Sequence, residues 1–262
     1  TTLFRSDIFK DNMEKYNDPE YYDLQYQSYL KDLPFLLEWA EKQNGKIVDL
    51  ACGTGRVTIP LAEQGYNIIG VDINEGMLNR AKEKTKNANL FIQWELQDCT
   101  MFSLNTVSSL IFMTGNSFQH FLTNDSQNKL LKSINTHLVD EGVFIFNTRF
   151  PILSELAFID ETTQTYFDKR NRKVNEYEVD SYNPLTQILH STSRREIYNN
   201  KGEVISIEKD SISLRYVFPL EMERLLEQNG FTIVNVFSSW EKAPLKNDSS
   251  EMIYVCKKVN SY

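Results

Sequence analysis

The sequence predicts an α/β fold, in which a doubly wound, mostly parallel seven-stranded sheet carries an inserted antiparallel β-sheet. Three observations predict it. Short apolar runs alternate with amphipathic segments from residue 47 to residue 147, which is typical of a parallel sheet covered by helices. The first run ends in an acid and a loop of small residues. Beyond Thr163 the pattern takes the period of two that favours antiparallel strands.

The elements of the main sheet follow in order along the first part of the chain. Leu36, Leu37 and Ala40 fall on one face of the first of them, a helix. The run 109–113 is nearly all apolar, as expected for a strand that is covered on both faces. We expect helices at 33–42, 57–64, 75–86 and 126–138, and strands at 47–50, 67–71, 90–95, 109–113 and 142–147.

The antiparallel insert is predicted between Thr163 and Phe218. Turn signals at Asn183-Pro184 and at 199–202 divide this stretch, and we expect three strands. A helix at 219–228 follows, with a proline in its first turn and a glycine after its end. Strands at 231–237 and 252–257 then complete the main sheet.

Domain boundaries follow from this change of pattern. We expect a core domain formed by residues 1–150 and 219–262. Its first 31 residues are rich in tyrosine near helical spacing and should form a cap of short helices. The β-rich insert, 151–218, is expected to cover the active site.

Composition excludes several classes of protein. The chain of 262 residues has a net charge of −8, which disfavours nucleic-acid binding because that requires a basic surface. Its three cysteines are far apart, with no metal-type spacing, and suggest a reducing compartment. No apolar run approaches the roughly 20 residues of a membrane span. We therefore expect a cytoplasmic protein without a metal, either a monomer or a homo-oligomer.

The loop after the first strand carries the strongest functional signal. It consists of Ala51, Cys52, Gly53, Thr54 and Gly55, preceded by Asp49. Small residues let a backbone bend sharply and a ligand approach it closely. Asp49 adds a negative charge that suits a cationic amine. The next strand ends in a second acid, Asp72, a position that accepts hydrogen bonds from both ribose hydroxyls in nucleotide-binding βαβ units.

The third glycine of a dinucleotide-binding loop is missing, because position 58 is threonine. This disfavours a nicotinamide-dependent oxidoreductase. The sequence Asp-Leu-Ala-Cys-Gly-Thr-Gly instead resembles the glycine-rich motif of class I S-adenosylmethionine-dependent methyltransferases, which have a Rossmann-like fold. The resemblance implies S-adenosylmethionine as cofactor and S-adenosylhomocysteine as product. It also implies an adenine pocket formed by Asp98, the backbone N–H of Cys99, Ile73 and Met77.

The loop after the fourth strand should face the reactive methyl group, because ligands lie beyond the carboxyl ends of such strands. It contains Thr114, Asn116, Ser117 and His120, and its Gly-Asn-Ser-Phe-x-His sequence resembles the corresponding loop of glycine N-methyltransferases. For His120 two roles stay open, a base or a packed side chain. In that family an arginine after the fifth strand pairs with the substrate carboxylate, and Arg149 matches its position.

The C-terminal part of the chain resembles amino-sugar N-methyltransferases through Arg215-Tyr216, Pro219 and Glu221. Their N-terminal Tyr-Asp pair lies near the sulfonium, a role that Tyr22, Tyr16 or Tyr26 can take here. We therefore expect methyl transfer from S-adenosylmethionine to a small-molecule acceptor, most simply an amine. An O-methyltransferase and a non-catalytic cofactor-binding protein are the alternatives.

Overall fold

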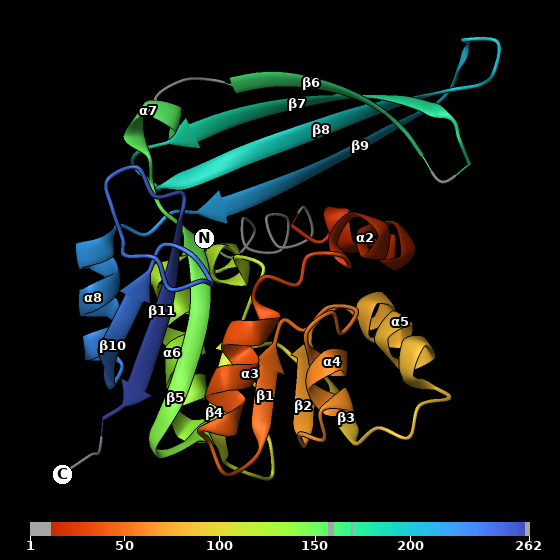
Figure 1. Cartoon of the computed structure of the whole chain (residues 1–262). Coiled ribbons are helices and arrows are strands. Elements are labelled where there is room, and N and C mark those ends of the chain that lie inside the picture. Colours follow the sequence, from red (N-terminus) through yellow and green to blue (C-terminus); the bar gives the residue numbers. More distant parts are fainter. Residues whose placement is uncertain (1–11, 157–159, 169, 260–262) are drawn as a thin grey trace. The chain divides into compact units, whose positions relative to one another are not determined.

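A computed structural model describes residues 12–156, 160–168 and 170–259 (Figure 1). The described residues form two compact units. One comprises residues 18–150 and 217–259, and the other comprises 12–17 and the described part of 151–216. Residues 1–11 of the predicted N-terminal cap lie outside the described residues. None of the described helices is long and apolar enough to cross a membrane.

The larger unit alternates strands and helices as predicted. Its elements are α2 (Pro19–Tyr26), α3 (Leu33–Glu41), β1 (Ile47–Leu50), α4 (Thr58–Glu63), β2 (Ile68–Asp72), α5 (Glu75–Thr85), β3 (Ile92–Leu96), β4 (Ser108–Met113), the 3₁₀ helix η2 (Ser117–His120), α6 (Asn124–His137), β5 (Leu138–Arg149), α8 (Pro219–Gln228), β10 (Phe231–Phe237) and β11 (Glu251–Lys258).

The seven strands form one sheet in the order β10-β11-β5-β4-β1-β2-β3. The pairs β5–β4, β4–β1, β1–β2 and β2–β3 are parallel, whereas β11 runs antiparallel to both of its neighbours. The predicted fold class is confirmed. Because β11 is antiparallel, its first residue, Glu251, lies opposite the last residue of β5, Arg149.

The core divides into two clusters because successive residues of a buried strand point to opposite faces of the sheet. In β4, Ile111 and Met113 pack with side chains of α6 and α8. Leu110 and Phe112 pack with side chains of α3 and α4. With both faces covered, the sheet leaves the ends of its strands, and the loops that follow them, for function.

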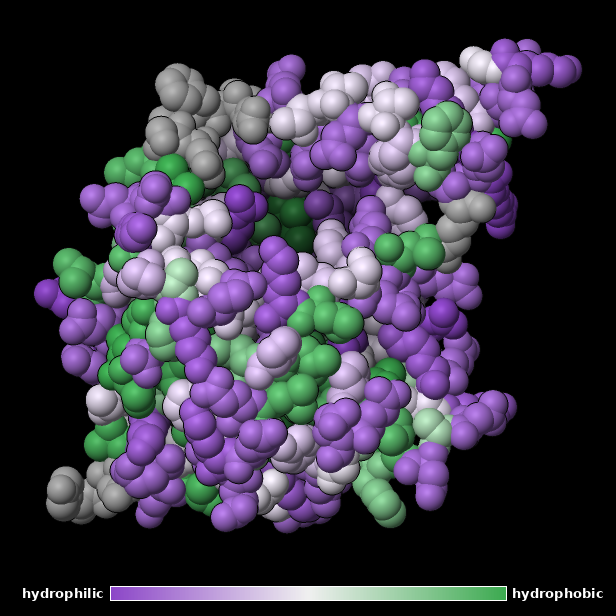
Figure 2. All heavy atoms as spheres, in the orientation of Figure 1, coloured by the Kyte–Doolittle hydropathy of each residue, from purple (hydrophilic) through white to green (hydrophobic). Residues whose placement is uncertain are grey.

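The smaller unit is an antiparallel sheet of four strands, not three. It contains η1 (Glu14–Tyr16), α7 (Leu153–Leu156), β6 (Asp160–Phe167), β7 (Lys173–Asn183), β8 (Ile188–Tyr198) and β9 (Val204–Arg215), and its strands lie in that order. Both predicted turns lie between strands. The prediction missed β6 because its sequence is mostly polar. Side chains over β6–β9, at the top of Figure 2, are accordingly mostly hydrophilic or intermediate.

The glycine loop depends on a close approach that only glycine permits. Gly55 has φ of +78°, and a Cβ there would lie 2.8 Å from Trp94 Cη2 and 3.1 Å from Ile59. Gly65 has a similar φ, +89°, but no atom within 4 Å of such a Cβ. Gly55→Ala should lower the free energy of unfolding by about 1–3 kcal/mol more than Gly65→Ala, the usual range for overpacking. Urea denaturation of the two variants measures this difference, and equal losses would contradict it.

Candidate active site

The loop from Ala51 to Gly55 connects β1 to α4, and most of its residues are buried. Ala51, Gly53 and Gly55 have φ of 54°, 56° and 78°, all in the left-handed region that glycine favours. A Cβ on Gly53 would lie 3.5 Å from Met77 Cε and 4.0 Å from Tyr22 Cε1. Two side chains that were predicted to contact the cofactor, Met77 and Tyr22, therefore lie close to this glycine.

Asp72 is tied directly to this loop. Its side chain is only 8% exposed. The backbone N–H of Gly53 donates to Asp72 Oδ2 at 2.8 Å, and that of Asn74 donates to Oδ1 at 2.8 Å. Each oxygen has lone pairs left for a further donor. The structure thus brings the acid that ends β2 against the glycine loop.

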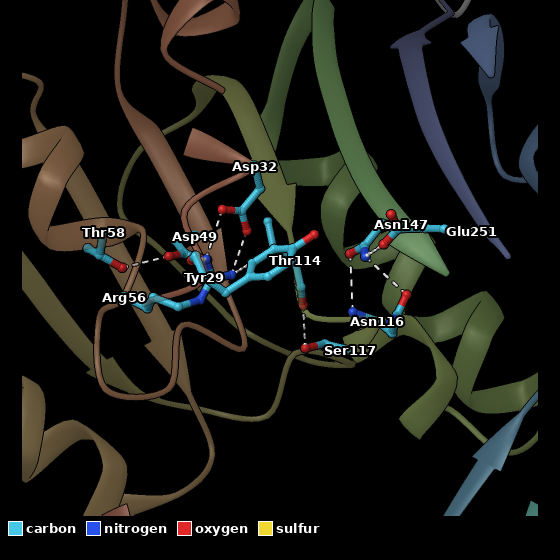
Figure 3. Close-up of polar contacts among 10 residues, drawn as sticks. All are labelled: Tyr29, Asp32, Asp49, Arg56, Thr58, Thr114, Asn116, Ser117, Asn147 and Glu251. Atoms are coloured by element: carbon cyan, nitrogen blue, oxygen red, sulfur yellow. Dashed lines mark hydrogen bonds and ion pairs between the residues drawn. The ribbon is translucent and has the colours of Figure 1, made fainter. Parts of the chain in front are cut away.

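Asp49, at the end of β1, is buried with an exposure of 2%. The hydroxyl of Thr58 donates to its Oδ2 at 2.6 Å (Figure 3). Burial raises the pKa of Asp49 to about 7, although the Thr58 hydrogen bond and the charge of Arg56 act in the opposite direction. A cation placed beside Asp49 would therefore stabilise its ionised form and lower this pKa.

The predicted adenine-pocket residues lie at the ends of β2 and β3. The backbone N–H of Gln97 donates to the Asp72 carbonyl at 3.0 Å, which joins the two strand ends. Asp98 Oδ1 accepts 2.8 Å hydrogen bonds from the backbone N–H and the hydroxyl of Thr100, so its carboxylate is fixed. Ile73 is 37% exposed, whereas Met77 and Cys99 are buried.

Among the candidate tyrosines, Tyr22 is the one that the structure brings to the glycine loop. Its ring lies 4.8 Å from that of Tyr26, between centroids, and Tyr26 is 46% exposed. Burial raises the pKa of Tyr22 to about 12, so its hydroxyl keeps its proton at neutral pH. Tyr16 belongs to the other unit.

The partner of Tyr22 in the sequence, Asp23, anchors helix α2, a role that sequence reasoning missed. Its carboxylate accepts from Thr54 Oγ1 at 2.5 Å, Arg80 Nε at 3.0 Å and Lys84 Nζ at 3.0 Å. Burial alone would raise the pKa of Asp23, but these hydrogen bonds outweigh it and lower the pKa. No sequence signal identified these partners, which are far from Asp23 along the chain.

A second unpredicted element is the ion pair between Arg56 and Asp32 (Figure 3). Arg56 donates to both carboxylate oxygens of Asp32, at 2.8 and 2.5 Å, and Asp32 is fully buried. The same guanidinium donates to Thr114 Oγ1 at 3.2 Å and to the Tyr29 carbonyl at 2.6 Å. Arg56 thereby connects the glycine loop to the loop after β4.

The loop after β4 holds Asn116 in a left-handed conformation, with φ of 58°. Its backbone N–H donates to Asn147 Oδ1 at 3.1 Å, and Asn147 Nδ2 donates back to Asn116 Oδ1 at 3.0 Å. Asn147 Nδ2 also donates a hydrogen bond to Glu251 Oε1 at 2.5 Å. Ser117 Oγ donates to the Thr114 carbonyl at 2.7 Å, which closes the turn (Figure 3).

The two remaining candidates differ in environment. Burial lowers the pKa of His120, in η2, to about 4, so its imidazole is neutral at physiological pH. Arg149 is exposed at the end of β5 and forms no ion pair with any described residue. A surface cavity elsewhere in this unit, between residues 100–107 and α6, involves neither of them.

Comparisons with known proteins bear on the family. Residues 47–142 match the family model for a methyltransferase domain. YqeM of Bacillus subtilis, named as a methyltransferase, is 30% identical over 130 residues, which are 48% of this chain and 52% of YqeM. A glycine/sarcosine N-methyltransferase of Aphanothece halophytica is 22% identical over 83% of this chain and 78% of that protein. An S-adenosylmethionine-dependent methyltransferase structure from Clostridium acetobutylicum has a TM-score of 0.77 at 21% identity, covering 92% and 97% of the two chains.

Residues 47–142 therefore match the methyltransferase-domain family, which confirms the predicted resemblance for that part of the chain. The structural likeness, at its low identity, adds the fold alone. The chain spans about half of the length of YqeM, and its own reaction and acceptor are proposed below.

The environment of Asp49 makes cofactor affinity depend on pH. If the amine of the cofactor binds beside Asp49 as a cation, it binds best to the ionised carboxylate. Because the pKa of Asp49 is raised to about 7, raising the pH from about 6 towards 8 should tighten binding, by up to about tenfold per pH unit below the pKa. Titration calorimetry measures this dependence. Asp49→Asn, which keeps an oxygen for Thr58, should remove it, and an unchanged pH dependence in that variant would place the amine elsewhere.

Proposed function

We propose that this chain transfers the methyl group of S-adenosylmethionine to the nitrogen of a small acceptor that has an amine and a carboxylate or other polar anchor. The observation that carries the proposal is the set of residues that gather at one end of the sheet, where the parallel strands have their carboxyl ends. The glycine loop and Asp72 lie at the ends of β1 and β2. Asn116, Arg149 and Glu251 follow at the neighbouring ends of β4, β5 and β11.

Within this proposal, the cofactor residues are those that the sequence singled out. Asp72 would accept from the ribose hydroxyls and Asp49 would face the amine of the methionine part. The fixed carboxylate of Asp98 and the N–H of Cys99 would bind the adenine edge, with Ile73 and Met77 on its faces. Tyr22 would lie near the sulfonium. The residues fit this ligand in their chemistry, because the Asp72 carboxylate beside the Gly53 amide can accept further hydrogen bonds and the side chains of Met77 and Tyr22 lie close to the same glycine.

The bound cofactor supplies an electrophilic methyl group with a good leaving group, so the chain itself must chiefly orient the acceptor and exclude water. An amine needs only to react in its deprotonated form. His120 is a weak base with its pKa lowered to about 4, which suits a packed or positioning side chain better than a proton acceptor. Arg149 is available to bind an anionic group, for which a guanidinium is well shaped.

Three further expectations complete the proposal. The four-stranded unit would serve as a cover for the site. The protein would act in the cytoplasm, in agreement with Cys52, Cys99 and Cys256, which are buried and free. It would act as a monomer or a homo-oligomer, without nucleic acid.

The reaction is tested with a panel of matched acceptors, by detecting S-adenosylhomocysteine release and the methylated product. Glycine, sarcosine and an amino sugar represent amines, whereas glycolate and a phenol represent hydroxyl acceptors. We expect turnover with at least one amine and none with its hydroxyl counterpart. Turnover of hydroxyl acceptors alone would identify an O-methyltransferase. Tight cofactor binding without turnover of an amine or hydroxyl acceptor would favour a binding protein.

Arg149 should determine affinity for the acceptor and not for the cofactor. Arg149→Ala removes the proposed partner of the acceptor's anionic group, so kcat/KM should fall by about tenfold or more. Cofactor affinity should change little, since no cofactor role is assigned to this side chain. Calorimetry with S-adenosylhomocysteine provides the control. If cofactor binding is lost in this variant, the arginine serves the cofactor or the fold instead.

A further inference from the structure

Two opposite charges at the end of the β5–β11 pair do not bind each other. Arg149 and Glu251 are directly opposite in the antiparallel register, and residues so placed project from the same face of a sheet. Glu251 nevertheless bonds to Asn147, while Arg149 stays exposed, without an ion pair to any described residue. This end of the sheet therefore presents a carboxylate and a guanidinium that are not paired with each other.

The two carboxylate oxygens of Glu251 differ in their hydrogen bonding. Its Oε1 accepts from Asn147, whose side chain is 3% exposed and is held by two hydrogen bonds with Asn116. Within the part of the chain that the structure describes, Oε2 has no hydrogen-bond donor. A carboxylate oxygen in this state can accept a short, charge-assisted hydrogen bond from an N–H group of a ligand.

The surroundings favour a cation at this point. The pKa of Glu251 is raised, first by burial and then by the nearby acids Asp32 and Glu241. The hydrogen bond from Asn147 and the charge of Arg149 act in the opposite direction. Burial raises the pKa of the nearby Tyr29 hydroxyl, and the charges of Glu251 and Asp32 raise it further. A carboxylate of raised proton affinity is better able to take a proton from an ammonium group than an ordinary glutamate.

We propose that Glu251 binds the amine of the methyl acceptor through Oε2, and that the acceptor is a small zwitterion whose anionic group pairs with Arg149. This inference rests on the proposed function. The acceptor enters as an ammonium and gives one proton to Glu251, which becomes a carboxylic acid, and the nitrogen regains its lone pair. The lone pair forms the N–C bond while the C–S bond breaks with its electrons going to sulfur. The products are the methylated ammonium, S-adenosylhomocysteine and one proton, which Glu251 returns to solvent.

The test is Glu251→Gln, which keeps the oxygen that accepts from Asn147 but cannot bind an ammonium as an anion or take its proton. With the amine that the wild type methylates best, KM should rise by about tenfold or more, and the acidic limb of the kcat/KM profile against pH should shift or disappear. Cofactor affinity should stay unchanged. N-acetylglycine, which has the carboxylate but no basic amine, should inhibit the variant and the wild type equally.

Glu141→Gln is the matched control. Glu141 lies at the other end of β5, exposed and paired with Lys257 at 3.4 Å, and its replacement should leave kinetics at the wild-type level. A Glu251→Gln enzyme with wild-type KM and pH profile overturns the inference. If that variant does not fold, Glu251→Asp provides the test. The shorter side chain moves the carboxylate away from the amine, so KM for the amine should rise, and an unchanged KM overturns the inference. A wild type that methylates only hydroxyl acceptors would instead refute the proposed function.

Discussion

The hydrogen bond from the Gly53 amide to Asp72 is the contact around which the proposed cofactor site is organised. It requires the left-handed backbone at Gly53 and joins the loop after β1 to the end of β2. The same strand end is joined to the loop after β3 through the Asp72 carbonyl and Gln97. Three consecutive strand ends are thus fixed by backbone donors and one carboxylate, and the side chains of Met77 and Tyr22 lie close to Gly53.

Buried charges extend this organisation to neighbouring helices. Asp23 ties α2 to the loop and to α5 through Thr54, Arg80 and Lys84, and the Arg56–Asp32 pair ties the loop to Thr114. Burying charges costs solvation, which a close, hydrogen-bonded partner offsets. Asp49 differs because its hydrogen-bond donor is the neutral Thr58 hydroxyl, and burial raises its pKa.

The residues that are proposed to bind the acceptor come together because of the direction of one strand, β11. If β11 were parallel to β5, its first residue would lie at the other end of the sheet, away from Arg149. Instead, β11 runs antiparallel to β5. Glu251 therefore lies beside Arg149 and Asn147, next to the strained turn at Asn116. One strand reversal thus adds a carboxylate to an end of the sheet that otherwise carries a guanidinium and two amides, and this combination of charges supports the proposed zwitterionic acceptor.

The sequence alone determined the alternation of elements, the glycine loop and the two acids that end β1 and β2, because these depend on local periodicity and on conformations that few residues adopt. It also indicated Arg149 and Asn116 through resemblance. It missed β6, whose polar residues lack the apolar alternation of a half-buried strand. Only the tertiary structure decided that Asp23 anchors α2, that Arg56 pairs with Asp32, and that Glu251 joins Asn147. Each of these contacts links residues distant in the chain, and no local pattern records which strand ends will meet.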